Sequence, residues 1–169
     1  MFGRKTLDDL RKLYLDELKD LYDAEHQILD ALPKLENAAE NHELKDAFAE
    51  HFEETKGHVR RLEQVFRGLG EEPERKTCEG IKGLIKEGDE FVKARGDGDT
   101  IDAALISAAQ RVEHYEIAAY GTLRTYARHL GHQDQVRLLE ETLDEESDAD
   151  EKLTEIAESG INEMAAVGA

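Results

Sequence analysis

The chain contains an internal repeat, and this repeat limits the possible folds more than any other feature. A shift of 91 positions carries the first half of the sequence onto the second without a gap. Within each half the apolar residues recur about every 3.6 positions, which is the helical period. The sequence therefore predicts two similar helical hairpins. The apolar pairs matched by the shift are Leu21 with Val112, Ile28 with Ala119, Leu32 with Leu123, Phe48 with Leu139, Phe52 with Leu143 and Leu62 with Leu153.

The hairpins are predicted at residues 6–70 and 100–160, within a single domain of residues 1–169. Residues 71–99 connect them and include a short helix, and the tail at 161–169 is expected to be frayed. A connector of this length can cross the whole bundle, so the second and third long helices can run parallel. The expected fold class is all-α: a ferritin-like four-helix bundle with one long crossover that carries an extra short helix.

Several residues mark the predicted helix ends. Thr6, with Asp9 three residues later, resembles a capping box at the start of the first helix. Pro33 removes one backbone donor inside that helix, so we expect a kink just before it. Gly70 follows the second helix, predicted at 43–69, and favours the left-handed conformation in which many helices end.

Three helices each carry a glutamate at the centre of an apolar stripe. These residues are Glu25, Glu116 and Glu146. The repeat aligns Glu25 with Glu116, whereas Glu146 aligns with Thr55. A carboxylate on an inward face is costly unless it is neutralised, paired or bound to a metal. Three such acids at matching depth point to a shared cation.

Di-iron and di-manganese carboxylate bundles take one glutamate from each of two helices and a Glu-x-x-His pair from each of the other two. Glu25 and Glu116 fit the helices that contribute a single glutamate. The other two helices depart from the pattern, and Glu146 fits a bridging position.

The second helix carries Glu54, with His51 three residues before it and His58 four residues after it. The fourth helix carries Asp150 four residues after Glu146, where the pattern would place a histidine at three. The ligand set is therefore partly substituted relative to the pattern.

The sequence thus predicts a binuclear iron or manganese centre, but alternatives stay open. A metal-free polar network accounts for the core glutamates as well, and His51 taken alone is equally a satisfied core histidine. We prefer to interpret Glu113 as a surface acid. The predicted ligands are Glu25, Glu54, His58, Glu116, Glu146 and Asp150, with His51 and Glu113 as second choices.

Charge and composition exclude several classes of function. The net charge is −18, from 40 acidic and 22 basic residues, which argues against nucleic-acid binding. The single cysteine, Cys78, cannot form a disulfide within the chain. The sequence has no signal peptide and no apolar run long enough for a membrane helix, so we expect a cytoplasmic protein.

Six motifs resemble the YciF-like stress-protein family, and the resemblance extends from about residue 6 to residue 162. It implies a ferritin-like, rubrerythrin-like helical bundle that forms homodimers and takes part in stress responses. Glu25, Glu54, Glu116 and Glu146 match motif positions, whereas His58 departs from a position where glutamine is common. The motifs are LYDAE (21–25), ALPK (31–34), HFEET (51–55), RLE (61–63), EHYEIAAYG (113–121) and TLDEE (142–146).

Residues and resemblance together predict a stress-response protein with a di-iron or di-manganese site that handles O₂ or peroxide. The alternative is a metal-free structural or regulatory dimer in the stress response. A third hypothesis, an iron-storage cage that protects DNA, conflicts with the acidic charge and the lack of a basic tail.

Overall fold

Helices account for all the regular structure in the computed structural model, which describes residue 6 and residues 8–167. No strand occurs within these residues, so the predicted all-α class is confirmed. The long helices are α1 (Leu10–Ala38), α2 (His42–Leu69), α4 (Gly98–His129) and α5 (Gln133–Ile156). The short segments are α3 (Glu79–Val92), the π-helical turn η1 (Ala157–Ile161) and α6 (Asn162–Val167).

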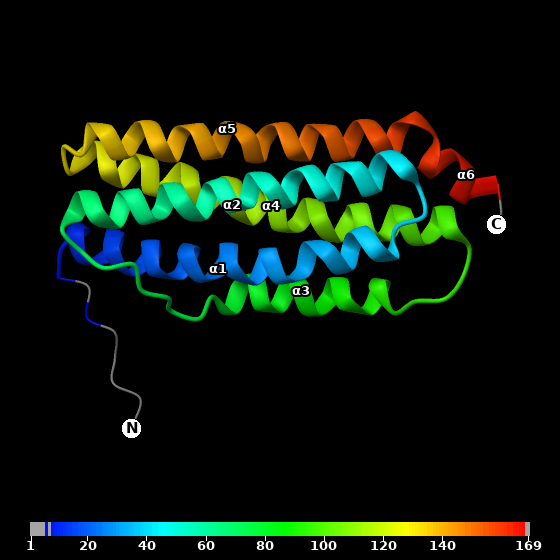
Figure 1. The fold of residues 1–169 in the computed structure, drawn as a ribbon, viewed down its shortest axis with the longest axis horizontal. Coiled ribbons are helices and arrows are strands. Elements are labelled where there is room, and N and C mark those ends of the chain that lie inside the picture. The colour runs from blue at the N-terminus through cyan, green and yellow to red at the C-terminus, as the bar shows by residue number, and fades with distance from the viewer. Residues whose placement is uncertain (1–5, 7, 168–169) are drawn as a thin grey trace, which may run out of the picture.

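The four long helices lie side by side, and α3 runs along the outside of α1 (Figure 1). The segment between α2 and α4 returns along the length of the bundle. Consequently α2 and α4 run in the same direction, as the length of the connector predicted. Helix α3 also contacts α4, so the crossover covers one face of the first hairpin and part of the second.

The apolar stripes of the repeat form the core that holds this bundle together. Leu21, Leu62 and Leu123 are almost completely buried, and burial of each such side chain stabilises the fold by about 1.5–3 kcal/mol. Val112 and Phe52, which the repeat also matches to apolar residues, are only partly buried. None of the described helices is both long enough and apolar enough to cross a lipid bilayer.

The first helix begins later than the sequence predicted. Its first residue is Leu10, and Asp9 is the cap, because the Asp9 carboxylate accepts a 2.8 Å hydrogen bond from the backbone N–H of Lys12. Thr6 lies outside the helix, so the capping-box prediction was wrong in placing the start there. Pro33 does not end the helix, which continues to Ala38.

The predicted end of the second helix agrees closely with the structure. Helix α2 ends at Leu69, and Gly70 adopts the predicted left-handed conformation with φ of 71°. Helix α3 starts after Cys78, whose Sγ accepts from the backbone N–H of Ile81 at 3.5 Å.

Two buried aspartates link the hairpins to each other and to the crossover. Asp102, at the start of α4, accepts hydrogen bonds from the backbone N–H groups of Glu40 (2.9 Å) and Asn41 (2.7 Å) in the turn between α1 and α2. Asp23 on α1 accepts from Arg75 Nε (2.9 Å) and from the Cys78 N–H (2.8 Å) in the connector. These bonds satisfy backbone donors that have no helical partner.

The prediction of a frayed tail was wrong for residues 161–167. Gly160, with φ of 159°, turns the chain within η1, and the residues after it form α6 against α4. Ile161 is buried, whereas Met164 and Val167 are exposed. Residues 168–169 lie outside the described part of the chain.

Candidate metal centre

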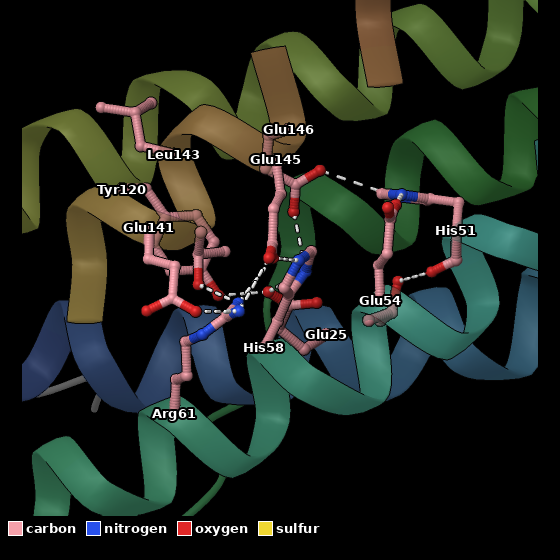
Figure 2. A network of polar contacts seen from close by, with 12 residues as sticks. Glu25, His51, Glu54, His58, Arg61, Tyr120, Glu141, Leu143, Glu145 and Glu146 are labelled. Carbon is pink, nitrogen blue, oxygen red and sulfur yellow. Dashed lines mark hydrogen bonds and ion pairs between the residues drawn. The ribbon is translucent and has the colours of Figure 1, made fainter. Parts of the chain in front are cut away.

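All four long helices direct polar side chains to one region in the middle of the bundle (Figure 2). Each of these residues is at most 5% exposed, so bulk water does not solvate their side chains. They are Glu25 from α1, His51 and His58 from α2, Glu113 and Glu116 from α4, and Glu146 from α5.

The six residues form two groups that share Glu146. In the first group, Glu25, His58 and Glu146 each offer one ligand atom, and these atoms lie within 4.8 Å of one another. In the second group, His51, Glu113, Glu116 and Glu146 meet the same condition. Each group could hold a metal ion, and Glu146 lies between the two groups.

The two histidines approach the shared carboxylate from opposite sides. His58 Nδ1 lies 3.0 Å from Glu146 Oε1 and 3.5 Å from Glu25 Oε1. His51 Nε2 lies 3.6 Å from Glu146 Oε2 and 3.5 Å from Glu113 Oε1. Each imidazole thus aims one nitrogen at the centre, as a metal ligand would.

Eight buried side-chain atoms in this region have no hydrogen bond of normal geometry, although several lie at ion-pair distance from one another. Buried polar atoms in folded proteins are nearly always hydrogen-bonded, so such a concentration needs an explanation. A cation that binds them supplies the missing partner. The atoms are Glu25 Oε2, His51 Nε2, His58 Nδ1, Glu113 Oε2, Glu116 Oε1 and Oε2, and Glu146 Oε1 and Oε2.

The carboxyl groups are held in an unfavourable environment for their charge. Burial raises the pKa of Glu113 and Glu116 well above the ordinary value, and repulsion from Glu146 raises both further. Burial also raises the pKa of Glu146, an effect that His58 opposes. Burial thus favours the protonated form of these acids when no cation is bound, and metal binding would displace those protons.

Burial alone would lower the pKa of His58, but Glu25, Glu145 and Glu146 raise it to about 12. The pKa of His51 is also raised, because Glu113 and Glu54 outweigh the effect of burial. The surrounding acids therefore favour the protonated form of both imidazoles.

Residues just outside the cluster orient its members. Glu145 lies 2.9 Å from His58 Nε2, the nitrogen that faces away from the centre, and accepts a 2.7 Å hydrogen bond from Arg61. Burial would raise the pKa of Glu145, but His58 and Arg61 lower it to about 2. The buried Tyr120 hydroxyl donates a short hydrogen bond to Glu25 Oε1. A carboxylate contact such as that of Glu145 with His58 fixes the ring orientation of a metal-binding histidine.

The structure brings four of the six predicted ligands together: Glu25, His58, Glu116 and Glu146. His51, a second choice, is part of the cluster as well. The interpretation of Glu113 as a surface acid was wrong, because its side chain is buried and belongs to the same group.

Two predicted ligands lie outside the cluster. Glu54 contacts the outer nitrogen of His51, Nδ1, at 3.2 Å and is about one-third exposed. Asp150 is partly buried and contacts His114 Nε2 at 3.1 Å and Gln110 Nε2 at 3.1 Å.

The sequence reasoning missed Tyr120, Glu145 and Arg61. Tyr120 lies four residues after Glu116, and Arg61 lies three residues after His58, so both share a helix face with a cluster residue. That spacing was the available signal for both.

Comparison with known proteins gives consistent results over nearly the whole chain. The family described as "Domain of unknown function (DUF892)" matches residues 9–166. Protein YciF of Escherichia coli strain K12 is 43% identical over 162 residues, which cover 95% of this chain and 96% of YciF.

Solved structures extend the comparison to the fold. The crystal structure of the E. coli stress protein YciF has a TM-score of 0.89 at 42% identity and covers 92% of this chain and 99% of that one. A ferritin-like, diiron-carboxylate protein from Bacillus anthracis matches with a TM-score of 0.68 at 17% identity. The match covers 90% of this chain and 99% of the Bacillus anthracis chain. The second likeness shows that the fold is ferritin-like.

Proposed function

We propose that this chain, which belongs to the DUF892 family, is a ferritin-like stress-response protein with a dinuclear iron or manganese centre in its core. One observation carries the proposal: two groups of buried ligand atoms share Glu146, and eight of the polar atoms in this region lack normal hydrogen bonds. Homology to YciF, a stress protein, supports the role in stress.

The charges of the cluster support two divalent ions. Four carboxylates, from Glu25, Glu113, Glu116 and Glu146, offset the four positive charges of two such ions. The donors are carboxylate oxygens and imidazole nitrogens, a mixture suited to iron and manganese. The lone cysteine, Cys78, is outside the cluster, so thiolate ligation does not contribute.

When bound, two such ions supply the electrons for reduction of O₂ or peroxide, which is the chemistry we propose. The chain itself has three tasks. Glu146 lies between the two groups and can bridge them, the Arg61–Glu145 pair holds the ring of His58, and the Tyr120 hydroxyl orients Glu25. The helices exclude bulk water from all of these groups.

The test is metal loading of chelator-treated protein with Fe²⁺ or Mn²⁺ without oxygen, followed by removal of free metal and elemental analysis. We expect about two ions per chain. Glu146→Gln should lose most of them, because both sites share this carboxylate. Glu151→Gln, an exposed change of the same charge on the same helix, should retain them. Wild-type protein that holds no metal would reject the centre.

A metal-free role is the second candidate, and one observation favours it. The pKa of His58 and His51 is raised, which favours protonated imidazoles that partly offset the charge of the acids without any ion. A melting temperature unmoved by iron, manganese or chelator would support this candidate. A rise with metal would exclude it, because only a ligand of the folded state stabilises it.

We also propose a homodimer, on the basis of the resemblance to YciF-like proteins. Light scattering should give twice the 19.1 kDa mass of the chain. A mass of one chain, or of a large cage, would reject the dimer.

A further inference from the structure

A pocket of about 230 Å³ opens between α2 and α5 and ends at the candidate metal centre. His51 and Glu113 of the cluster form part of its lining. Both residues are at most 5% exposed, and the atoms His51 Nε2 and Glu113 Oε2 have no hydrogen bond. The pocket therefore leads from solvent to polar atoms that lack partners.

We infer that this pocket is the route by which divalent cations reach the centre, with Glu54 and Asp148 as the acids that attract them. The inference rests on the proposed function, since it concerns how the same centre is filled. It gives Glu54, which lies outside the cluster, a role on the path to the ligands.

The charge of the outer pocket suits cations. Glu50, Glu54 and Asp148 contribute three acids to its lining, against one base, Lys152. Lys152 forms a short ion pair with Glu50, which leaves Glu54 and Asp148 as the acids without a lysine partner in the pocket. A cleft lined by one sign of charge concentrates ions of the other sign.

Glu54 connects the outer pocket with the buried ligands. Its side chain is 36% exposed, and its Oε2 lies 3.2 Å from His51 Nδ1. The opposite nitrogen of the same ring, Nε2, faces Glu113 and Glu146 (Figure 2 shows His51 and Glu54 side by side on α2). A cation that meets Glu54 is thus one imidazole ring away from the centre.

A second pocket also touches the cluster, but its lining does not suit ions. It lies between α1, α3 and α4, has a volume of only about 40 Å³, and reaches Glu113 from the other side. Leu84, Ile85 and Val92 are among the mainly apolar residues that line it. Transfer of a hydrated cation through an apolar passage is costly, so the pocket between α2 and α5 is the favoured route.

The test follows the rate of Co²⁺ uptake by the metal-free full-length chain in a stopped-flow absorbance experiment at low ionic strength. The variant Glu54→Gln/Asp148→Asn should take up Co²⁺ about tenfold more slowly than wild type, within the range reported for electrostatic steering. Added salt should reduce this difference. Lys152→Gln should accelerate uptake of Co²⁺, because it removes the one basic side chain from the outer pocket.

The matched control is Glu53→Gln/Asp134→Asn, which removes the same charge from exposed positions on the same two helices outside the pocket lining. Its rate should stay at the wild-type value. All variants should reach the same final content of Co²⁺, and melting curves without metal should show that each is folded.

The outcomes separate the route from the centre. Wild-type protein that binds no Co²⁺ rejects the proposed function and the route with it. Normal loading with unchanged rates in the pocket variants overturns the route alone. Loss of a bound ion at saturation in Glu54→Gln/Asp148→Asn also overturns it, because an acid on the route would then be a ligand.

Discussion

Replacement of Glu116 by glutamine should make the metal-free protein less sensitive to alkaline pH. Both carboxylate oxygens of Glu116 are buried without a hydrogen bond. Burial, followed by repulsion from Glu146 and Glu25, raises the pKa of Glu116 well above its ordinary value of 4.5. Folded and unfolded chains therefore differ in how many protons they bind at this residue.

The sign of the effect follows from that difference. Above pH 4.5 the unfolded chain has released the Glu116 proton, whereas the folded chain retains it until the raised pKa is reached. Unfolding then releases a proton, so the free energy of unfolding falls as pH rises through this window. One such proton corresponds to about 1.4 kcal/mol per pH unit.

For a chain of this size, that slope corresponds to about 3–6 °C in melting temperature per pH unit. Glu113 and Glu146 have pKa values shifted in the same direction, so wild-type protein without metal should lose stability steeply as the pH rises above their ordinary pKa of 4.5. Glu116→Gln should reduce that slope by about one proton, because glutamine does not titrate.

The assay is urea denaturation of chelator-treated protein at a series of pH values. The exposed change Asp134→Asn serves as the control. If the free energy of unfolding falls with pH at the same slope in wild type and in Glu116→Gln, the reasoning is refuted. Glu116 would then exchange no proton on unfolding. The same variant should also gain less stability from added metal than wild type does.

Three further predictions test residues around the centre and the crossover. Tyr120→Phe removes the hydrogen bond to Glu25, so metal affinity measured by competition with a chelator should fall about 10–100-fold; unchanged affinity would contradict an orienting role. Asp102→Ala leaves two backbone N–H groups without their acceptor, so urea denaturation should show a free energy of unfolding lower by about 2–4 kcal/mol. A decrease of less than about 1 kcal/mol would contradict the stabilising role of these two hydrogen bonds. Gly80→Ala would place its Cβ 2.6 Å from the Tyr115 ring, so thermal unfolding should show a stability lower by about 1–3 kcal/mol. A variant as stable as wild type would disprove this clash.

The fold was largely predictable because periodicity and connector length are visible in the sequence. The 91-residue repeat indicated two hairpins, and a connector of about thirty residues implied the parallel arrangement of α2 and α4. The tail was not predictable in the same way. Gly160 commonly marks the end of a helix, but here it turns the chain so that α6 packs against α4, a tertiary contact that no local signal reports.

The centre was predictable where a glutamate interrupts an apolar stripe. Glu25, Glu116 and Glu146 meet this condition, and all three belong to the cluster. Glu113 was only a second choice although it shares a helix face with Glu116, because an acid beside an apolar stripe is more often exposed. Its burial depends on how α4 packs against the neighbouring helices, which the sequence does not report.

Glu54 and Asp150 show the limit of a spacing argument. A helix turns by about 100° per residue, so a one-residue difference moves a side chain away from the core. Glu54 therefore lies at the edge beside His51, and Asp150 lies outside beside His114. Which of the neighbouring acids faces inward depends on how the helices are rotated against one another, and this rotation is set by packing.

The division of the cluster into unequal groups implies that two bound ions would not be equivalent. One compartment offers three residues and the other offers four, with Glu146 common to both. The richer compartment, which contains His51 and Glu113, is also the one in contact with the pocket between α2 and α5. Occupancy should therefore develop in sequence, with a half-filled intermediate in which the compartment with four ligand residues is preferred.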